Sequence, residues 1–273
     1  MQKKAKVAIV VLNYLNDADT VECVQSIREL EGGPYDVVVV DNGSPDDVYA
    51  RLQQHFEAEP GITLLRSPKN VGFARGNNLG ITYARRAQKA DFVLVVNNDT
   101  ILTDPGYITK LLEAYEPGVG ILGSKILLPG NKEQNRFGEY LDWKNCFVNF
   151  VNFRSRLDGA CFDFELDKSK RIKMLNGCSL LFTPDFFRHY KGFFEKTFLY
   201  YEETILYLMC MRHGLRQKYL ETTEIFHKES QASEISFSDL SRARAQYYAQ
   251  SYKWVLWWRL KVQLLGKMHC EIE

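Results

Sequence analysis

The chain lacks several features that would mark particular protein classes. No apolar run in its 273 residues approaches the roughly 20 residues that cross a bilayer. The formal net charge is only +1, which gives no basis for binding nucleic acid over the whole surface. The apolar run at residues 7–12 is too short for a signal peptide and predicts a first strand instead. We therefore expect a cytoplasmic protein without a nucleic-acid partner.

Paired cysteines and the common nucleotide-binding fingerprints are missing as well. No two cysteines form a C-x-x-C pair, so we expect reduced, mostly packing residues. The six cysteines are Cys23, Cys146, Cys161, Cys178, Cys210 and Cys270. The sequence has neither G-x-G-x-x-G after its first apolar run nor G-x-x-x-x-G-K-[ST]. These absences disfavour a Rossmann dinucleotide fold and a P-loop site.

The first part of the chain instead alternates short apolar runs with helix signals. The runs are rich in β-branched residues, which is typical of strands buried on both faces of a parallel sheet. They are residues 6–12, 35–40, 61–65 and 92–96. Between them, a capping box beginning at Asp19 and a proline at position 45 predict helix starts. Right-handed crossovers would place helices on both faces of the sheet.

Polar side chains stand where these predicted strands end. Asn13 and Tyr14 follow the first strand, Asp41 follows the second, and Asn98 and Asp99 follow the fourth. In open parallel sheets the carboxyl ends of the strands line the ligand crevice. We expect a polar ligand there, with Asp99 holding a divalent cation or the ligand itself. Taken alone, Asp99 is equally well explained as a cap for a helix near residue 105.

The loop after the third predicted strand adds chemistry suited to phosphate. Arg75 stands among glycines at the start of a predicted helix, and helix N–H groups favour anions. A solvated helix charge remains the alternative for Arg75. Plain turn and packing chemistry remains the alternative for Gly72 and Gly76.

Four motifs in this order resemble the family 2 glycosyltransferases of GT-A fold, and most closely their rhamnosyltransferase-like branch. They are VAIVVLNY (7–14), VVVDNGS (38–44), NVGFARGNNLG (70–80) and LVVNND (94–99). The likeness runs from about residue 6 to about residue 233. It implies an α/β fold with a mostly parallel sheet flanked by helices and a C-terminal helical appendage. The implied catalytic domain is 1–235, with a nucleotide-binding half (1–118) and an acceptor-binding half (119–235), and the appendage is 236–273.

The resemblance also implies roles for single residues in the first half. Asp41 would bind the nucleotide base, and Tyr14 would line the base pocket. The loop residues Asn70, Gly72 and Arg75 would contact the nucleotide. The family's D-x-D signature appears as residues 97–99, in which only the last acid is kept. Asp99 is then the implied ligand of Mg2+ or Mn2+, and Asn98 a ribose contact.

Two motifs in the second half complete the resemblance. Glu202 and Glu203 lie between an aromatic run and an apolar helix, where acids also suit a helix N-terminus. They resemble the family's Glu-Asp motif, whose second acid is the general base, so Glu203 is the implied base. Ile205 and Met209 depart from the family pattern. His227 resembles a histidine that ligates the metal or contacts the diphosphate, although an ordinary packed histidine is the alternative.

The remaining stretches are less informative. Residues 120–123, 125–128 and 174–182 predict strands, and residues 132–170 show no clean period, so we interpret them as a loop and hairpin region over the acceptor side. The tail from Phe237 predicts a helix that mixes aromatic and cationic residues. This mixture suits a peripheral contact with the inner face of a membrane. Packing on the catalytic domain, or on the second subunit of a homodimer, is the other interpretation.

The resemblance implies inverting transfer of a sugar from a UDP- or dTDP-linked donor to a hydroxyl of a saccharide or lipid-linked acceptor. Synthesis of a polysaccharide or another glycoconjugate is the expected context. A sugar nucleotidyltransferase is a second hypothesis, but it needs a basic, glycine-rich loop after the first strand, where this chain has Asn13, Tyr14, Leu15 and Asn16. A catalytically silent nucleotide-sugar-binding module is the third.

Overall fold

The computed structural model describes residues 5–134, 137–140, 143–157, 171–229 and 240–265. The helices are α1 (Asp17–Arg28), α2 (Asp46–Phe56), α3 (Phe73–Arg86), α4 (Tyr107–Glu113), α5 (Trp143–Leu157), α6 (Pro184–Phe187), α7 (Glu202–His213) and α9 (Leu240–Leu265). The strands are β1 (Val7–Asn13), β2 (Asp36–Asp41), β3 (Ile62–Arg66), β4 (Phe92–Asn97), β5 (Thr100–Ile101), β6 (Val119–Leu128), β7 (Lys132–Glu133), β8 (Phe137–Tyr140), β9 (Arg171–Met174), β10 (Ser179–Phe182) and β11 (Arg216–His227).

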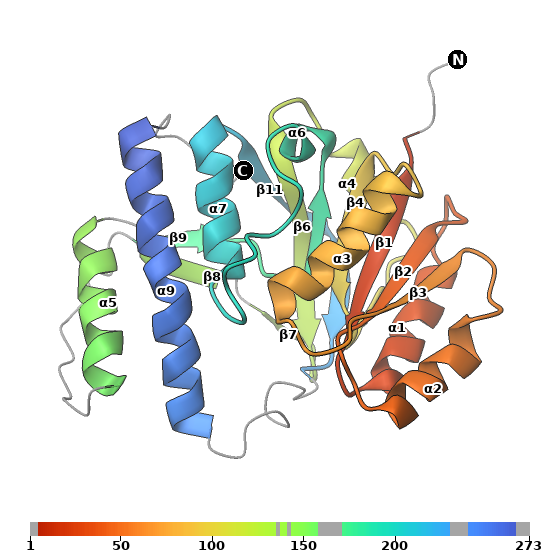
Figure 1. The fold of residues 1–273 in the computed structure, drawn as a ribbon. Helices are drawn as coiled ribbons and strands as arrows, with labels where there is room; N and C mark the ends of the chain where they lie inside the picture. The colour runs from red at the N-terminus through yellow and green to blue at the C-terminus, as the bar shows by residue number, and fades with distance from the viewer. Residues whose placement is uncertain (1–4, 135–136, 141–142, 158–170, 230–239, 266–273) are drawn as a thin grey trace.

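One large sheet runs through the molecule in the order β3-β2-β1-β4-β10-β6-β11-β5 (Figure 1). Strands β3, β2, β1 and β4 are parallel neighbours, and β11 is parallel to β6. β10 is antiparallel to both β4 and β6, and β5 is antiparallel to β11. The sheet is therefore mixed: its first four strands form the predicted parallel part, and helices flank it as predicted.

Alternate side chains of the central strands enter two separate cores. Val10 and Val40 face the core that contains side chains of α3, α7 and α9. Ile9 and Val39 face the other core, which contains side chains of α1, α2 and α4. Because both faces of these strands are covered, apolar residues occupy successive positions instead of alternating with polar ones.

Helix α9 packs beside α7 and α5 on one flank of the sheet (Figure 1). Its buried side chains include Ser251, Tyr252, Val255, Trp258 and Val262. This arrangement confirms the predicted C-terminal helix. Within the described part of the chain, no helix combines the length and apolar character needed to cross a bilayer.

Three predicted elements need correction. The region 132–170 contains the 15-residue helix α5 and strands β7 and β8 rather than only a loop and hairpin. Residues 119–128 form one strand, because β11 pairs with them on both sides of Ser124. The stretch 174–182 is divided between β9 and β10, because residues 175–178 form a turn between them.

The first helix also starts earlier than predicted. Its N-cap is Asn16, whose side-chain oxygen accepts a hydrogen bond from the Asp19 backbone N–H at 3.2 Å. Asp19 therefore lies inside α1 and not at its cap. Four cysteines, Cys23, Cys146, Cys178 and Cys210, are buried thiols as predicted, and the other two lie outside the described residues.

Candidate active site

The carboxyl ends of the parallel strands meet at one edge of the sheet. Asn13 at the end of β1 is in register with Asp41 at the end of β2, and Leu12 is in register with Asn97 at the end of β4. Parallel neighbours place these ends side by side. The polar residues that follow the strands therefore share one edge, as predicted.

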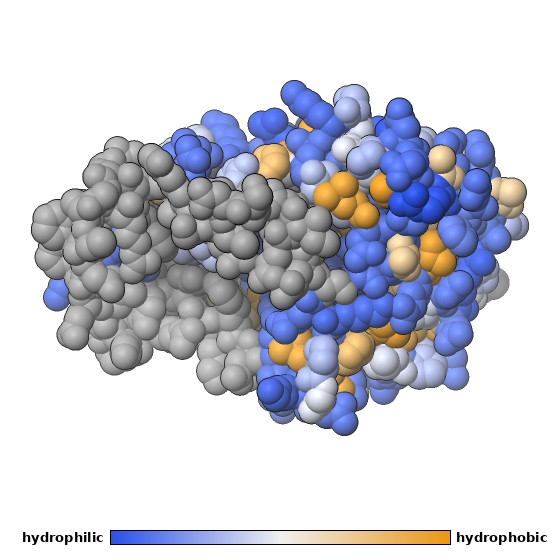
Figure 2. All heavy atoms as spheres, turned by 90° about the horizontal axis from the view of Figure 1, so that it is seen from below, coloured by the Kyte–Doolittle hydropathy of each residue, from blue (hydrophilic) through white to orange (hydrophobic). Residues whose placement is uncertain are grey.

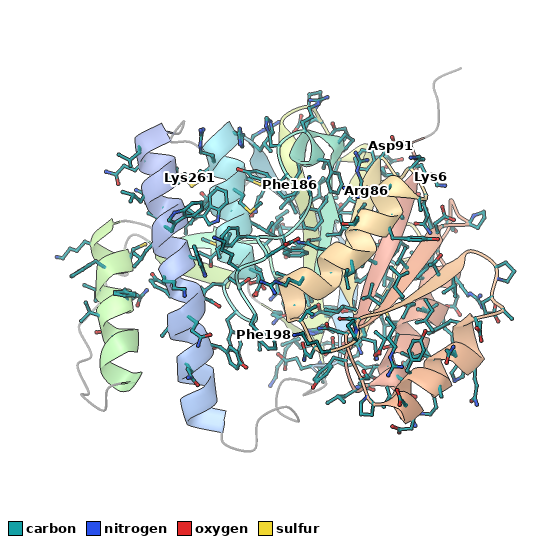
Figure 3. The ribbon with its side chains drawn as sticks, in the orientation of Figure 1. Lys6, Arg86, Asp91, Phe186, Phe198 and Lys261 are labelled. Carbon is teal, nitrogen blue, oxygen red and sulfur yellow. The ribbon has the colours of Figure 1, made fainter. Side chains whose placement is uncertain are left out.

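Figure 3 shows the two ends of the sheet through labelled residues. Lys6 and Asp91 lie together at the end where β1 and β4 begin, and the Lys6 backbone N–H donates to the Asp91 carboxylate at 2.9 Å. Phe198 lies at the opposite end, below α3. Figure 2 looks onto that opposite end, where the described surface is mostly hydrophilic with small apolar groups.

Asp41 is fully buried and organises the loop after β1. Its carboxylate accepts from the Asn13 side-chain amide at 2.9 Å and from the Ser44 backbone N–H at 3.2 Å. Arg66 Nε lies 3.6 Å from the same carboxylate, which balances its charge. The Ser44 hydroxyl in turn accepts from the Leu15 N–H, next to the half-buried Tyr14. The direct contact of Asp41 and Tyr14 with a base stays a prediction.

A chain of buried polar contacts connects Asp41 with the end of β4. The Asn13 side-chain oxygen accepts from the Thr20 hydroxyl at 2.8 Å. The Asn98 amide donates to the Thr20 hydroxyl and to the Asn16 carbonyl, both at 3.1 Å. Asn98 therefore joins the β4 end to the start of α1, and its predicted ribose contact remains untested.

The loop before α3 lies against the segment that leads into α7. Asn70 Oδ1 accepts from the Gly72 N–H at 2.9 Å and fixes the loop. Gly72 has φ +88°, and a Cβ there would come within 2.5 Å of the Phe198 carbonyl oxygen. The Phe73 N–H donates to that same carbonyl at 2.8 Å, and Arg75 Nε donates to the Glu195 carbonyl at 2.9 Å.

Glu203 lies in the first turn of α7 and faces the turn between β9 and β10. Its Oε1 accepts from the Gly177 N–H at 3.2 Å, and the side chain keeps partial exposure. Burial raises the pKa of Glu203, while the Gly177 hydrogen bond opposes that rise. A raised pKa suits a carboxylate that takes up a proton near neutral pH.

Asp99 and Glu203 lie near the same buried thiol. Burial raises the pKa of Cys178, and the negative charges of Asp99 and Glu203 raise it further. The Cys178 carbonyl accepts from the Asn97 N–H at 2.9 Å, which holds this turn against the end of β4. The two acids, far apart in sequence, are thereby brought to the same part of the sheet edge.

Two strained residues precede the paired acids. Tyr200 and Tyr201 have φ values of 72° and 68°, and such left-handed conformations cost about 1–3 kcal/mol each. Glu202 follows and is buried, with Oε1 lacking a hydrogen-bond partner among the described residues. Burial raises the pKa of Glu202 to about 8, and the neighbouring Glu203 adds to this. Of the two acids, Glu202 is the buried one, and Glu203 is the partly exposed one beside Gly177.

Asp99 lies beside His227 and does not cap a helix. Asp99 Oδ1 is 3.2 Å from His227 Nε2, and both side chains are largely buried. The Gly106 N–H at the start of α4 instead bonds to Asp104 Oδ1 at 3.0 Å. Lys228 holds the histidine loop on α1 through ion pairs with Asp19 and Glu22.

The Asp99–His227 pair fits part of a metal site. Two neighbouring ligand atoms, each about 2.1 Å from the same cation, lie about 3 Å from each other. This is close to the distance between Asp99 Oδ1 and His227 Nε2. No group of three or more potential ligands occurs among the described residues, so the ligand's own oxygens would have to complete the coordination sphere. Such a shared arrangement is usual for Mg2+ bound to phosphates.

Sequence reasoning missed several residues that organise this edge. Asn13 was expected only as a polar strand end, yet it connects Asp41 to Thr20. Gly177 lay inside a predicted strand, although the Asn-Gly pair at 176–177 is a turn signal that could have revealed it. Nothing in the sequence near Lys228 indicated that it would form ion pairs with α1.

Comparison with known proteins adds family evidence. Residues 7–166 match the model for glycosyl transferase family 2. An uncharacterized protein, MT1568 of Mycobacterium tuberculosis, is 32% identical over 119 residues, which are 43% of this chain and 35% of that relative. The chain thus spans about a third of that relative's length.

Two other relatives align over most of the chain. The low-salt glycan biosynthesis hexosyltransferase Agl10 of Haloferax volcanii is 21% identical over 81% of this chain and 67% of its own length. An N-acetylglucosaminyl-diphospho-decaprenol L-rhamnosyltransferase of M. tuberculosis is 25% identical over 83% of this chain and 78% of its own length.

Solved structures share the fold at low identity. The mannosyltransferase PcManGT from Pyrobaculum calidifontis, in complex with GDP-Man and Mn2+, has a TM-score of 0.58 at 14% identity, covering 96% of this chain and 75% of its own. S. aureus TarS 1–349 has a TM-score of 0.53 at 14% identity, covering 90% and 70%. With the family model matching more than half of its residues, the chain belongs to glycosyl transferase family 2 and has the GT-A fold.

Proposed function

We propose that this chain is an inverting glycosyltransferase that moves a sugar from a nucleotide-diphosphate donor to an acceptor hydroxyl. Glu203 acts as general base and removes the hydroxyl proton as the acceptor oxygen attacks the anomeric carbon. The carbon–oxygen bond to the diphosphate breaks as the new glycosidic bond forms. The nucleoside diphosphate leaves with its electron pair, and the sugar is inverted at the anomeric carbon.

One observation carries this proposal. The turn at residues 177–178 joins the end of β4 to Glu203, although the two come from opposite halves of the chain. The Gly177 N–H donates to Glu203 Oε1 at 3.2 Å, and the Cys178 carbonyl accepts from the Asn97 N–H at 2.9 Å. Asp99 follows the β4 strand where a donor diphosphate would bind, and Glu203 starts α7. With this placement the donor would lie on one side and the proton acceptor on the other.

Asp99 and His227 would hold a divalent cation, Mg2+ or Mn2+, against the donor diphosphate. When bound, the cation would neutralise the charge that develops on the leaving diphosphate. The separation of 3.2 Å between Asp99 Oδ1 and His227 Nε2 supports this assignment. The structural neighbour PcManGT was solved with Mn2+.

The donor side is assigned from the residues along the sheet edge. Asp41 and Tyr14 would contact the base, Asn98 the ribose, and the Asn70–Gly72 loop with Arg75 the rest of the nucleotide. A UDP- or dTDP-linked hexose, with rhamnose as one member of this class, is the proposed donor. The named relatives act in glycan synthesis or on a decaprenol-linked acceptor, which supports a saccharide or lipid-linked acceptor here.

We also propose the division into a catalytic domain, 1–235, and a C-terminal appendage, 236–273. Peripheral membrane contact through α9 and a homodimer remain proposals too. Exposed apolar side chains on α9, Trp257 and Leu264, support a contact surface there.

Glu203→Gln tests the function directly. The amide cannot accept the acceptor proton, so turnover should fall by about 10²–10⁴-fold while the fold and donor binding are kept. The assay is release of nucleoside diphosphate from a panel of nucleotide sugars with Mn2+ and saccharide acceptors. Glu113→Gln, at an exposed position of α4, is the matched control and should keep full turnover. Near-normal turnover of Glu203→Gln would contradict the proposal, and no transfer by the unaltered protein with any donor would favour a silent binding module.

A further inference from the structure

We infer that helix α9 is the positioning element for Glu203, and that Tyr248 and Ser251 are its key residues. They act through the segment 198–201, which leads directly into the first turn of α7. Neither residue is assigned a contact with substrate, so both are positioning residues. The inference rests on the proposed role of Glu203 and names what holds that side chain in place.

Polar and aromatic contacts fasten the segment to α9. The buried Ser251 hydroxyl donates to the Leu199 carbonyl at 2.8 Å. The Tyr248 ring stacks on Tyr200, with centroids 4.3 Å apart and planes at 17°. The Tyr252 ring meets Tyr201 edge to face at 4.9 Å. Three successive residues of the segment are therefore each held by a different side chain of α9.

The backbone of the segment needs such support. Tyr200 and Tyr201 both have positive φ, a conformation that tyrosine rarely adopts. Strained residues of this kind persist only where the surrounding structure fixes them. Tyr201 is also the N-cap of α7 without a side-chain capping bond, and its carbonyl accepts from the Ile205 N–H at 3.0 Å. The direction in which α7 starts, and hence the direction of Glu203, depends on this bend.

The other end of the same segment touches the donor loop. The Phe198 carbonyl accepts from the Phe73 N–H, and the Phe198 ring stacks on Tyr247 at 5.1 Å. A change at Tyr247 would therefore disturb both the loop at Gly72 and the general base, Glu203. Tyr248 and Ser251 contact residues 199–201, the part of the segment that leads to Glu203, and they are the better positions for a test.

The test compares Tyr248→Ala and Ser251→Ala with the unaltered chain in the transfer assay. Each should lower kcat by about 10-fold or more, because a base displaced by about 1 Å loses its alignment. The donor Kd, measured by calorimetry with Mn2+, should stay within about twofold, since the donor loop keeps its own contacts. Tyr248→Phe keeps the stacking ring and should restore kcat. Gln263→Ala, at an exposed position of the same helix, should leave kcat unchanged.

The pH profile separates positioning from a general loss of structure. A loosened segment admits water to Glu203, which removes part of the burial that raises its pKa. The acid limb of kcat should therefore move to lower pH in Ser251→Ala and Tyr248→Ala. If the acid limb of kcat stays at the same pH, and kcat and donor affinity fall equally, the role of these residues is merely structural and the inference is overturned. Unchanged kcat in Ser251→Ala would overturn it as well.

Two controls keep the outcome decisive. If Tyr248→Ala does not fold, shown by a lost melting transition, Ser251→Ala alone decides, because it removes only one hydroxyl. Glu203→Gln is run in parallel. If Glu203→Gln retains turnover, the proposed function fails; if it is inactive while both α9 variants are normal, only the positioning role fails.

Discussion

At the scale of single residues, the site depends on the close approach of Gly177 to Glu203. A Cβ on residue 177 would come within 2.5 Å of Glu203 Oε1, so only glycine leaves the carboxylate where it is. The atom in the way is the free end of a side chain, and it can swing aside at little cost in stability. Geometry at this position therefore affects the chemistry more than the fold.

Gly177→Ala should lower kcat by about 10- to 100-fold while the free energy of unfolding changes little. The added methyl group pushes the Glu203 carboxylate away from its place. Steady-state kinetics and urea denaturation measure the two quantities. Gly106→Ala is the control, because its Cβ would meet other atoms only at ordinary distances of 3.5 Å or more. A kcat for Gly177→Ala equal to that of the control would refute the placement of Glu203.

Glu202 gives stability a predictable dependence on pH. The pKa of Glu202 is raised from 4.5 to about 8, chiefly by burial. Between these values the unfolded chain releases a proton that the folded chain keeps, so this group makes the folded state less stable as pH rises. The contribution approaches about 1.4 kcal/mol per pH unit.

The stability of Glu202→Gln relative to the unaltered chain should therefore increase as the pH rises from roughly 5.5 to roughly 7.5, a range that lies between the two pKa values. The amide has no proton to release, and its shape is that of the protonated acid. Urea denaturation at several pH values measures the difference. A difference that stays constant with pH would mean that Glu202 is ionised in the folded protein.

Single-residue roles were only partly predictable from the sequence. Asp41 and Asp99 stand out because a carboxylate directly after a buried strand must lie at its end. Tyr200 and Tyr201 give no such signal, because tyrosine does not favour positive φ and only the contacts with α9 impose it. The N-cap at Asn16 was missed because Asp19, with Glu22 three residues later, matched the same pattern.

At the scale of elements, the loop before α3 and the segment before α7 form one unit. Gly72 is where they touch, since its missing side chain lets the Phe198 backbone approach. The loop belongs to the proposed donor site and the segment leads to the proposed base. Phe198 touches the loop, and residues 199–201 lead on from there to Glu203.

Gly72→Ala should destabilise the protein by about 2–4 kcal/mol, because the methyl group meets backbone atoms at a strained φ. Gly118→Ala is the matched control: its φ is +91°, but nothing lies within 4 Å of the added Cβ. That control should cost about 1 kcal/mol from backbone strain alone. Denaturation curves compare the two variants. Equal losses would mean that the contact with Phe198 contributes nothing.

Elements buried on both faces were the easiest to predict. Strands β1, β2 and β4 read as continuous apolar runs because two cores cover them, and their bounds match the expected ones closely. β3 was expected to be buried on both faces as well, but it lies at the edge of the sheet and is only partly buried. Helix α5 was missed because its sequence mixes aromatic and charged residues without a clean helical period. Its fold depends on packing against α9, which a local pattern does not show.

At the scale of the whole molecule, residues from distant parts of the chain converge on one edge of the sheet. Asp41 and Asp99 come from the first half, and Glu203 and His227 from the second. The alternation of strands and helices in the sequence predicted that Asp41 and Asp99 share this edge. The position of Glu203 and His227 was predictable only through the family resemblance, since nothing local says that β10 and β11 insert beside β4 and β6.

Ligand and metal should therefore stabilise the whole fold together. A nucleotide sugar at 100 times its Kd should raise the free energy of unfolding by about 2.7 kcal/mol, and the melting temperature should rise with it. The effect should be larger when Mn2+ is present. His227→Ala should raise the Mn2+ concentration needed for half of this effect by about 10-fold or more. His55→Ala, at an exposed position of α2, should behave like the unaltered chain. The same Mn2+ response in both variants would remove His227 from the metal site.

The most direct measurement is a crystal structure of Glu203→Gln with a nucleotide-diphosphate sugar and Mn2+. We predict that the base lies by Asp41, the cation contacts Asp99 and His227, and the anomeric carbon faces residue 203. A donor bound away from the strand ends, or with its sugar turned from residue 203, would contradict the account.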